Sequence, residues 1–134
     1  KAISAMIDAA LAEAPAAATG PDAGEDARCA SALRSSGWDV QPSSDGRDPG
    51  VDLIATKDAK KVAVQCKRFS SPVPDSVIHE VIMGAARHGA NATAIVSGAG
   101  YTDEARVLAN STMTLLLNHE QVAQLEAHVD GRRR

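Results

Sequence analysis

Apolar and polar residues alternate along two short runs near the middle of the chain. The runs cover residues 51–56, which follow Pro49-Gly50, and residues 62–67. A period of two is typical of a strand that buries one face. The segment between the runs is short and polar. The pattern therefore predicts an antiparallel β-hairpin with residues 57–61 as its loop.

The register of this hairpin follows from keeping the apolar side chains of both strands on one face. Pairing Leu53 with Cys66 achieves this, whereas a slip by one residue would turn every side chain over. Asp52 then lies opposite Lys67 on the other face with Gln65 beside them, and opposed Cβ atoms are about 4.5–5.5 Å apart. A carboxylate, an amide oxygen and an ammonium in one patch suit a phosphate and a cation that prefers oxygen ligands. An ordinary cross-strand ion pair is the alternative interpretation.

The remaining patterns predict an ordered series of helices and strands. Helices are expected over residues 2–14, 22–35, 75–89, 102–109 and 120–128, and strands over residues 38–41, 92–97 and 114–118. The hairpin requires antiparallel pairing, whereas the later strand–helix–strand segments require parallel pairing. The expected fold class is therefore α/β, with a mixed sheet covered by helices on both faces.

The length of the chain limits the number of domains, and its charge distribution indicates possible partners. At 134 residues it has room for one domain with its own core. We expect residues 22–128 to form this domain, residues 129–134 a basic tail, and residues 1–21 a helix and linker or the end of an upstream domain. The net charge is −3, but basic residues gather about the hairpin. Such clusters are usually solvated faces, and beside a phosphate site they steer DNA.

Composition also predicts the cellular location of the protein. No apolar run reaches 18 residues, and residues 2–14 lack the basic leader and long apolar run of a signal peptide. The two cysteines, Cys29 and Cys66, have no CxxC spacing. We expect them to be buried thiols in a reducing compartment, forming neither a disulfide nor a zinc site. The cytoplasm is the expected location.

The two strands of the hairpin carry a family resemblance. Gly50-Val51-Asp52-Leu53-Ile54, followed by Val64-Gln65-Cys66-Lys67-Arg68-Phe69, resembles the Mrr-type restriction endonuclease domain. This group belongs to the restriction-endonuclease-like PD-(D/E)xK superfamily, whose signature is Asp…(Asp/Glu/Gln)-x-Lys, and Gln commonly replaces the second acid within it. The resemblance runs in consistent order over about residues 25–125. It implies a three-layer α/β/α fold with a central mixed sheet, in the core order αβββαβ with an extra αβα.

The resemblance also implies an activity and a set of site residues. The activity is a Mg²⁺-dependent DNA endonuclease in restriction or defence, with Mn²⁺ as a substitute ion. Asp52 and Gln65 would bind the metal, with the Cys66 backbone carbonyl as a further ligand, and Lys67 would position or activate the attacking water. A third acid is usual in the preceding helix, where this chain offers Asp26 or Glu25 in place of the family's glutamate.

The implied partner is DNA, with no membrane, and a homodimer and further domains of the parent chain stay open. The candidate DNA-binding residues are Lys60, Lys61, Arg68 and Arg47. Two alternatives remain. The first is a nuclease-fold domain that binds DNA or mediates assembly without cutting, because Gln65 is neutral. The second is an unrelated α/β binding domain.

Overall fold

The computed structural model describes residues 23–43, 50–66 and 69–132. The helix expected over residues 2–14 lies outside these ranges. The elements are α2 (Ala23–Ser35), β1 (Asp39–Pro42), β2 (Leu53–Lys57), β3 (Lys60–Cys66), α3 (Asp75–His88), β4 (Ala92–Val96), α4 (Asp103–Thr112), β5 (Leu115–Leu117), the 3₁₀ helix η2 (His119–Gln124) and α5 (Leu125–Arg132). Their order confirms the predicted series. Within the described ranges, no helix is both long and apolar enough to cross a membrane.

Helix ends follow the local signals in the sequence. Gly89 adopts a left-handed φ of 67° and ends α3 with backbone hydrogen bonds to the last turn. The Thr102 side chain accepts a hydrogen bond from the Ala105 amide and begins α4. Left-handed glycine and hydroxyl caps satisfy backbone groups that a helix leaves unpaired. Gly89 and Thr102 stand at the ends of the helices expected over residues 75–89 and 102–109.

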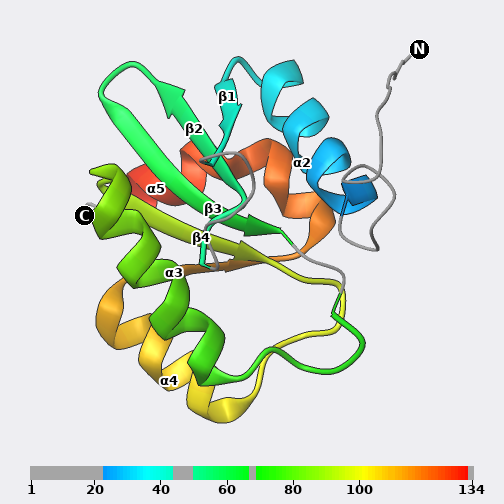
Figure 1. Ribbon diagram of the computed structural model, residues 1–134, viewed down its shortest axis with the longest axis vertical. Helices are drawn as coiled ribbons and strands as arrows, with labels where there is room; N and C mark the ends of the chain where they lie inside the picture. Colours follow the sequence, from blue (N-terminus) through cyan, green and yellow to red (C-terminus); the bar gives the residue numbers. More distant parts are fainter. Residues whose placement is uncertain (1–22, 44–49, 67–68, 133–134) are drawn as a thin grey trace.

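The sheet is mixed, with strand order β1-β2-β3-β4-β5. β1, β2 and β3 pair antiparallel, whereas β3, β4 and β5 pair parallel. Two apolar cores cover its faces. One packs the sheet against α2, η2 and α5, and the other packs it against α3 and α4. Figure 1 shows these helices on opposite sides of the sheet. The three-layer arrangement is the one that was expected.

The predicted hairpin register was wrong by two residues. Leu53 lies opposite Val64 rather than Cys66, and Lys57 lies opposite Lys60. The loop is therefore the tight pair Asp58 and Ala59, with Asp58 in the left-handed region at a φ of 55°. A shift by two residues leaves every side chain on its expected face, because the side-chain period is two. The hydrophobic pattern thus gave the correct faces, whereas the turn fixed the pairing.

An ion cluster fastens α5 to the turn of the hairpin. The Lys57 and Lys60 ammonium groups bond the Glu126 carboxylate at 2.7 Å and 3.2 Å, and Lys60 also lies 3.6 Å from Asp130. Hydrogen bonds from Lys57 and Lys60 lower the pKa of Glu126. The basic residues at this end of the hairpin are therefore partly neutralised by the acids of α5.

The segment that enters β2 passes very close to α3. A Cβ atom built on Gly50 would lie 2.0 Å from the backbone oxygen of Glu80. Real Cβ atoms do not approach a helix backbone so closely, so only glycine fits without a shift of the chain. Gly50 therefore sets the path of the chain into Asp52.

We expect Gly50→Ala to lower the free energy of unfolding by about 1–3 kcal/mol, because the added methyl group overpacks the contact with α3. Urea denaturation measures the change. Gly131→Ala is the matched control, since a Cβ at Gly131 meets nothing within 4 Å. Equal stability of the two variants would show that the backbone before Asp52 has room to move.

Candidate active site

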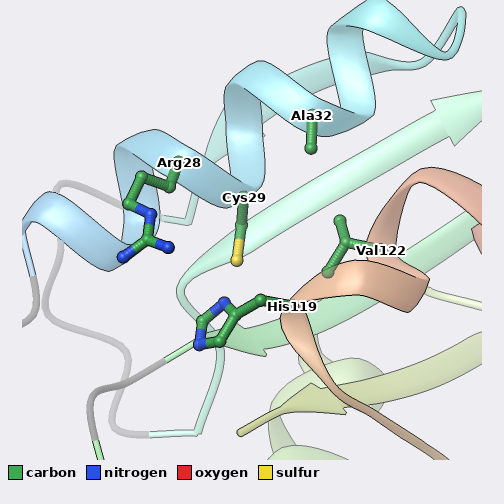
Figure 2. Close-up of a pocket in the computed structure, with 5 residues that line it drawn as sticks. All are labelled: Arg28, Cys29, Ala32, His119 and Val122. Carbon is green, nitrogen blue, oxygen red and sulfur yellow. The ribbon is translucent and has the colours of Figure 1, made fainter. Parts of the chain in front are cut away.

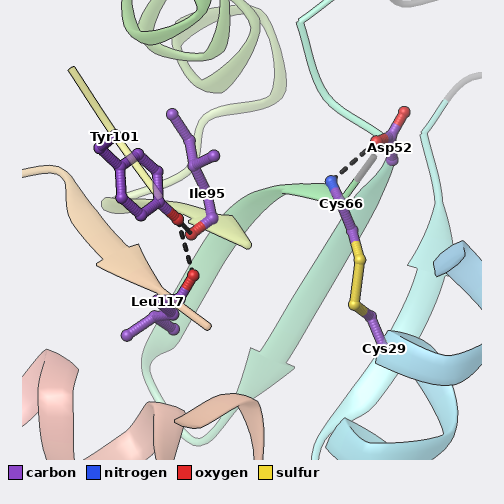
Figure 3. Close-up of a disulfide and its surroundings, with 6 residues drawn as sticks. All are labelled: Cys29, Asp52, Cys66, Ile95, Tyr101 and Leu117. Atoms are coloured by element: carbon purple, nitrogen blue, oxygen red, sulfur yellow. Dashed lines mark hydrogen bonds between the residues drawn. A yellow bond between two sulfur atoms is a disulfide. The ribbon is translucent and has the colours of Figure 1, made fainter. Parts of the chain in front are cut away.

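Asp52 is held at the carboxyl end of β3 by three hydrogen bonds. Its amide donates to the Val64 carbonyl at 2.9 Å, and its own carbonyl accepts from the Ser43 amide at 3.0 Å. Its carboxylate oxygen Oδ2 accepts from the Cys66 amide at 2.8 Å. Figure 3 shows this last bond, which joins the side chain of Asp52 to the last residue of β3. The carboxylate is therefore fixed in place, because a charge-assisted bond to the backbone is stronger than a neutral one.

Ser43 completes this anchor from β1. Its side chain is 1% exposed, and its hydroxyl donates to the Val51 carbonyl. Together with the amide bond to Asp52, this ties both residues before β2 to the end of β1. Sequence patterns gave no sign of this role, because residue 43 falls in a polar loop whose contacts depend on the folded path.

Gln65 is a polar side chain in a fully buried position. It is 1% exposed and lies opposite Ile95 of β4 in the sheet. Ile95 belongs to the apolar core under α3 and α4, so the Gln65 side chain enters that core. Its oxygen Oε1 is buried and accepts no hydrogen bond within the part of the chain that is described. A buried polar atom of this kind costs about 1–3 kcal/mol, so its retention calls for a reason beyond stability.

The third candidate acid lies on α2. Asp26 is half-buried, and its Oδ1 atom lies in the buried part of the side chain. It lies one turn before Cys29, whose disulfide partner is the last residue of β3. This linkage places the first half of α2 beside the carboxyl end of β3. The side chain of Glu25, the other candidate, lies outside the described part.

The prediction of two reduced thiols was wrong. Cys29 and Cys66 form a disulfide between α2 and β3, with Cα atoms 6.9 Å apart. Their spacing of 37 residues gave no indication of this pairing, because it results from packing α2 on the face of the sheet that Cys66 also faces. Figure 3 shows the bridge next to the bond between Asp52 and the Cys66 amide. The disulfide therefore reaches the candidate site directly.

Several predicted site residues are not brought together by the described structure. Lys67, Arg68 and Arg47 lie outside it. Lys60 and Lys61 begin β3, whereas Gln65 and Cys66 end it. With about 3.3 Å per residue, the two ends of this strand are about 20 Å apart. The Lys60 ammonium group is also bonded to Glu126 on α5.

Tyr101 supports the same edge of the sheet from a neighbouring loop. Its hydroxyl lies 2.9 Å from the Ile95 carbonyl and 2.6 Å from the Leu117 carbonyl (Figure 3). Burial raises the pKa of this phenol, so it stays protonated and able to donate. The hydroxyl thereby bridges β4 and β5. These bonds indicate a structural role for Tyr101.

The donor set suits a hard divalent cation. Asp52 and Asp26 supply carboxylate oxygens, and Gln65 supplies a buried amide oxygen with no hydrogen bond. Among the described residues, no group of three or more His, Cys, Asp or Glu side chains is placed to hold a metal. Amide and backbone carbonyl oxygens are also normal ligands of Mg²⁺ and Ca²⁺. The residues therefore fit a cation that takes mixed carboxylate and amide oxygens, and they do not fit zinc.

Comparison with known proteins decides the family. A family model described as "Restriction endonuclease", Mrr_cat, matches residues 26–125. The chain belongs to this restriction endonuclease family. The matched range includes Asp26, Asp52 and Gln65, and it confirms the resemblance that the hairpin indicated.

Solved structures confirm the fold of this Mrr-type domain. The "Protein of Unknown Function AF1548" superposes with a TM-score of 0.56 at 16% identity, covering 70% of this chain and 57% of that one. The MspJI restriction endonuclease, in complex with a 27-mer oligonucleotide, superposes with a TM-score of 0.50 at 18% identity, covering 73% of this chain and 25% of that one. The chain thus spans about half or less of each of these structures. No curated protein matches the chain.

The buried Gln65 oxygen, which accepts no hydrogen bond among the described residues, gives a test of its role by stability rather than by activity. We expect Gln65→Met, a substitution of similar volume, to raise the free energy of unfolding by about 1 kcal/mol, because it removes an unsatisfied polar atom from the core. Chemical denaturation measures it. Gln41→Met on the exposed face of β1 is the control and should change stability by less than about 0.5 kcal/mol. A clear loss of stability at position 65 would mean that the amide is retained for the fold.

Proposed function

We propose that this Mrr-type domain is a metal-dependent endonuclease that hydrolyses phosphodiester bonds in DNA. Membership of a restriction endonuclease family supports this proposal. The observation that carries it is the buried Gln65 oxygen, which accepts no hydrogen bond among the described residues, at the end of the strand that fixes the Asp52 carboxylate. A cation would satisfy both oxygens at once.

Asp52, Gln65 and the Cys66 carbonyl would hold the ion, with Asp26 or Glu25 as a further ligand or as a holder of metal-bound water. Mg²⁺ fits this oxygen set, Mn²⁺ can substitute, and the ion would supply positive charge to the scissile phosphate. The Cys66 amide keeps the Asp52 carboxylate oriented, so the ligand need not reorganise when the ion binds.

The family resemblance assigns Lys67 the role of positioning or activating the attacking water. Lys67 would orient this water in line with the leaving oxygen and offset the charge that develops on the phosphate. The reaction joins the water oxygen to phosphorus, breaks the bond from phosphorus to the leaving oxygen, and returns a proton to the leaving group.

DNA would lie across the edge of the sheet where β3 ends. Arg47 and Arg68 flank Asp52 and Gln65 in the sequence and are our proposed phosphate contacts. Lys60 and Lys61 stay predictions, and they begin β3 at the other end of the hairpin. They would contact DNA only away from the cleaved bond.

One observation favours a second candidate function. The described acids do not form a group of three, and Gln65 adds no charge, so a domain that binds DNA without cutting it also agrees with the geometry. The two functions differ in one respect. Only the nuclease requires both Asp52 and a divalent ion for breakage of the DNA backbone.

We expect Asp52→Asn to lower Mg²⁺-dependent nicking of supercoiled plasmid by about 100-fold or more, since loss of one charged group at the reacting centre costs this much. The asparagine oxygen can still accept the Cys66 amide, so circular dichroism and the melting temperature should change little. Asp39→Asn on exposed β1 is the control and should cut like the native protein.

Chelation of divalent ions should abolish nicking by the native protein, and added Mg²⁺ or Mn²⁺ should restore it. Undiminished nicking by Asp52→Asn would exclude Asp52 from the reaction. No nicking by the native protein, together with retained DNA binding, would instead favour the non-cutting alternative.

A further inference from the structure

One end of the disulfide lies within the segment that carries the candidate site residues. It joins Cys29 of α2 to Cys66, which stands between Gln65 and Lys67 in the sequence. These are the two cysteines of the whole chain, so any thiol chemistry of the domain passes through this pair. A bridge placed for stability alone has no need to end inside the segment that carries the candidate ligands.

Cys66 couples the bridge to the candidate site by two routes. Its amide donates to the Asp52 carboxylate at 2.8 Å. Its side chain faces the core under α2, whereas the adjacent Gln65 faces the core under α3 and α4. The bridged residue is therefore the one whose amide holds the Asp52 carboxylate, and it directly follows Gln65. At its other end, the bridge fixes α2, which carries Asp26 one turn before Cys29.

The Cys29 side of the bridge borders a cavity. The cavity measures about 220 Å³ and lies between α2 and η2, and its lining residues are Arg28, Cys29, Ala32, His119 and Val122. Figure 2 shows the Arg28 guanidinium, the His119 ring and the Cys29 sulfur turned toward the same space. Cys29 is 2% exposed and lines the cavity, whereas Cys66 is fully buried and does not line it. A small thiol could therefore approach the Cys29 sulfur here, and Arg28 would attract an anionic one.

We propose that the disulfide is a redox latch on the candidate metal site, opened by a small thiol through this cavity. A thiolate attacks Sγ of Cys29, the bond between the two sulfurs breaks, and Cys66 leaves as a thiolate that takes up a proton. A second thiol then attacks the mixed disulfide and releases Cys29 as a thiol. The two reductant thiols together lose two electrons and become a disulfide, and the bridge accepts those two electrons as it becomes two thiols.

The oxidised form is the metal-competent form. The bridge joins the middle of α2 to the last residue of β3, so the helix that carries Asp26 and the Cys66 amide that orients Asp52 are held in place before the ion arrives. Opening the bridge removes none of the ligand residues, but it loosens the backbone that supports them. Loss of such supporting contacts lowers metal affinity by about 10-fold or more. The effect on the ion rests on the proposed function, whereas the opening of the bridge does not.

The test compares Mn²⁺ affinity in the two redox states. The whole chain is titrated calorimetrically after purification in air, and again after dithiothreitol treatment and anaerobic removal of the reductant. A thiol assay verifies the state, and circular dichroism verifies folding. We expect the oxidised protein to bind Mn²⁺ about 10-fold more tightly than the reduced protein. Cys29→Ser should bind like the reduced protein with or without dithiothreitol.

The route of opening has its own test. Glutathione is an anionic thiol and dithiothreitol a neutral one, so Arg28→Glu should slow reduction by glutathione several-fold and leave reduction by dithiothreitol unchanged. Arg106→Glu, an exposed change on α4 at the opposite face, is the matched control for net charge. Equal slowing by both arginine variants would overturn the cavity as the route.

The outcomes separate this inference from the proposed function. Equal Mn²⁺ affinity in both redox states would overturn the latch while leaving the metal site intact. Unfolding on reduction would overturn it too, because the bridge would then serve stability alone. Absence of Mn²⁺ binding in both states would overturn the proposed metal site, and the latch with it.

Discussion

Strand β3 is buried on both faces, and this constraint governs the rest of the structure. It pairs antiparallel with β2 and parallel with β4, and two separate apolar cores cover its two sides. A strand in this position should be apolar throughout. Its buried stretch from Val62 to Cys66 is apolar except for Gln65, which lies at the end where the Asp52 carboxylate is tied to the backbone. The candidate chemistry is thus concentrated where the fold tolerates polar groups least.

Several contacts position the residues around that end of β3. Gly50 lets the chain pass against α3, and Ser43 ties the next two residues to β1, so that Asp52 arrives in a fixed orientation. The disulfide brings α2 to the same edge, and Tyr101 joins β4 to β5 there. At the opposite end of the hairpin, the acids of α5 neutralise Lys57 and Lys60. The end of the sheet near Asp52 therefore carries the candidate site, and the opposite end of the hairpin holds α5.

The sequence predicted those features that follow from local periodicity. The alternation in residues 51–56 and 62–67 gave two strands and the correct face for Asp52 and Gln65, and Gly89 and Thr102 marked helix ends. It failed where geometry is set by distant parts of the chain. The hairpin register depended on a left-handed Asp58, and the disulfide depended on how α2 packs on the sheet. The anchoring role of Ser43 likewise exists only once the path through Gly50 is fixed.

The central claim is that Gln65 is kept in the core as a metal ligand, and calorimetric titration with Mn²⁺ in the absence of DNA tests it most directly. Gln65→Glu adds a negative charge at the ligand position, so it should bind Mn²⁺ more tightly than the native protein. Gln65→Met removes the oxygen and should bind more weakly. If all three proteins bind Mn²⁺ equally, residue 65 does not hold the ion, and the account of the site is contradicted.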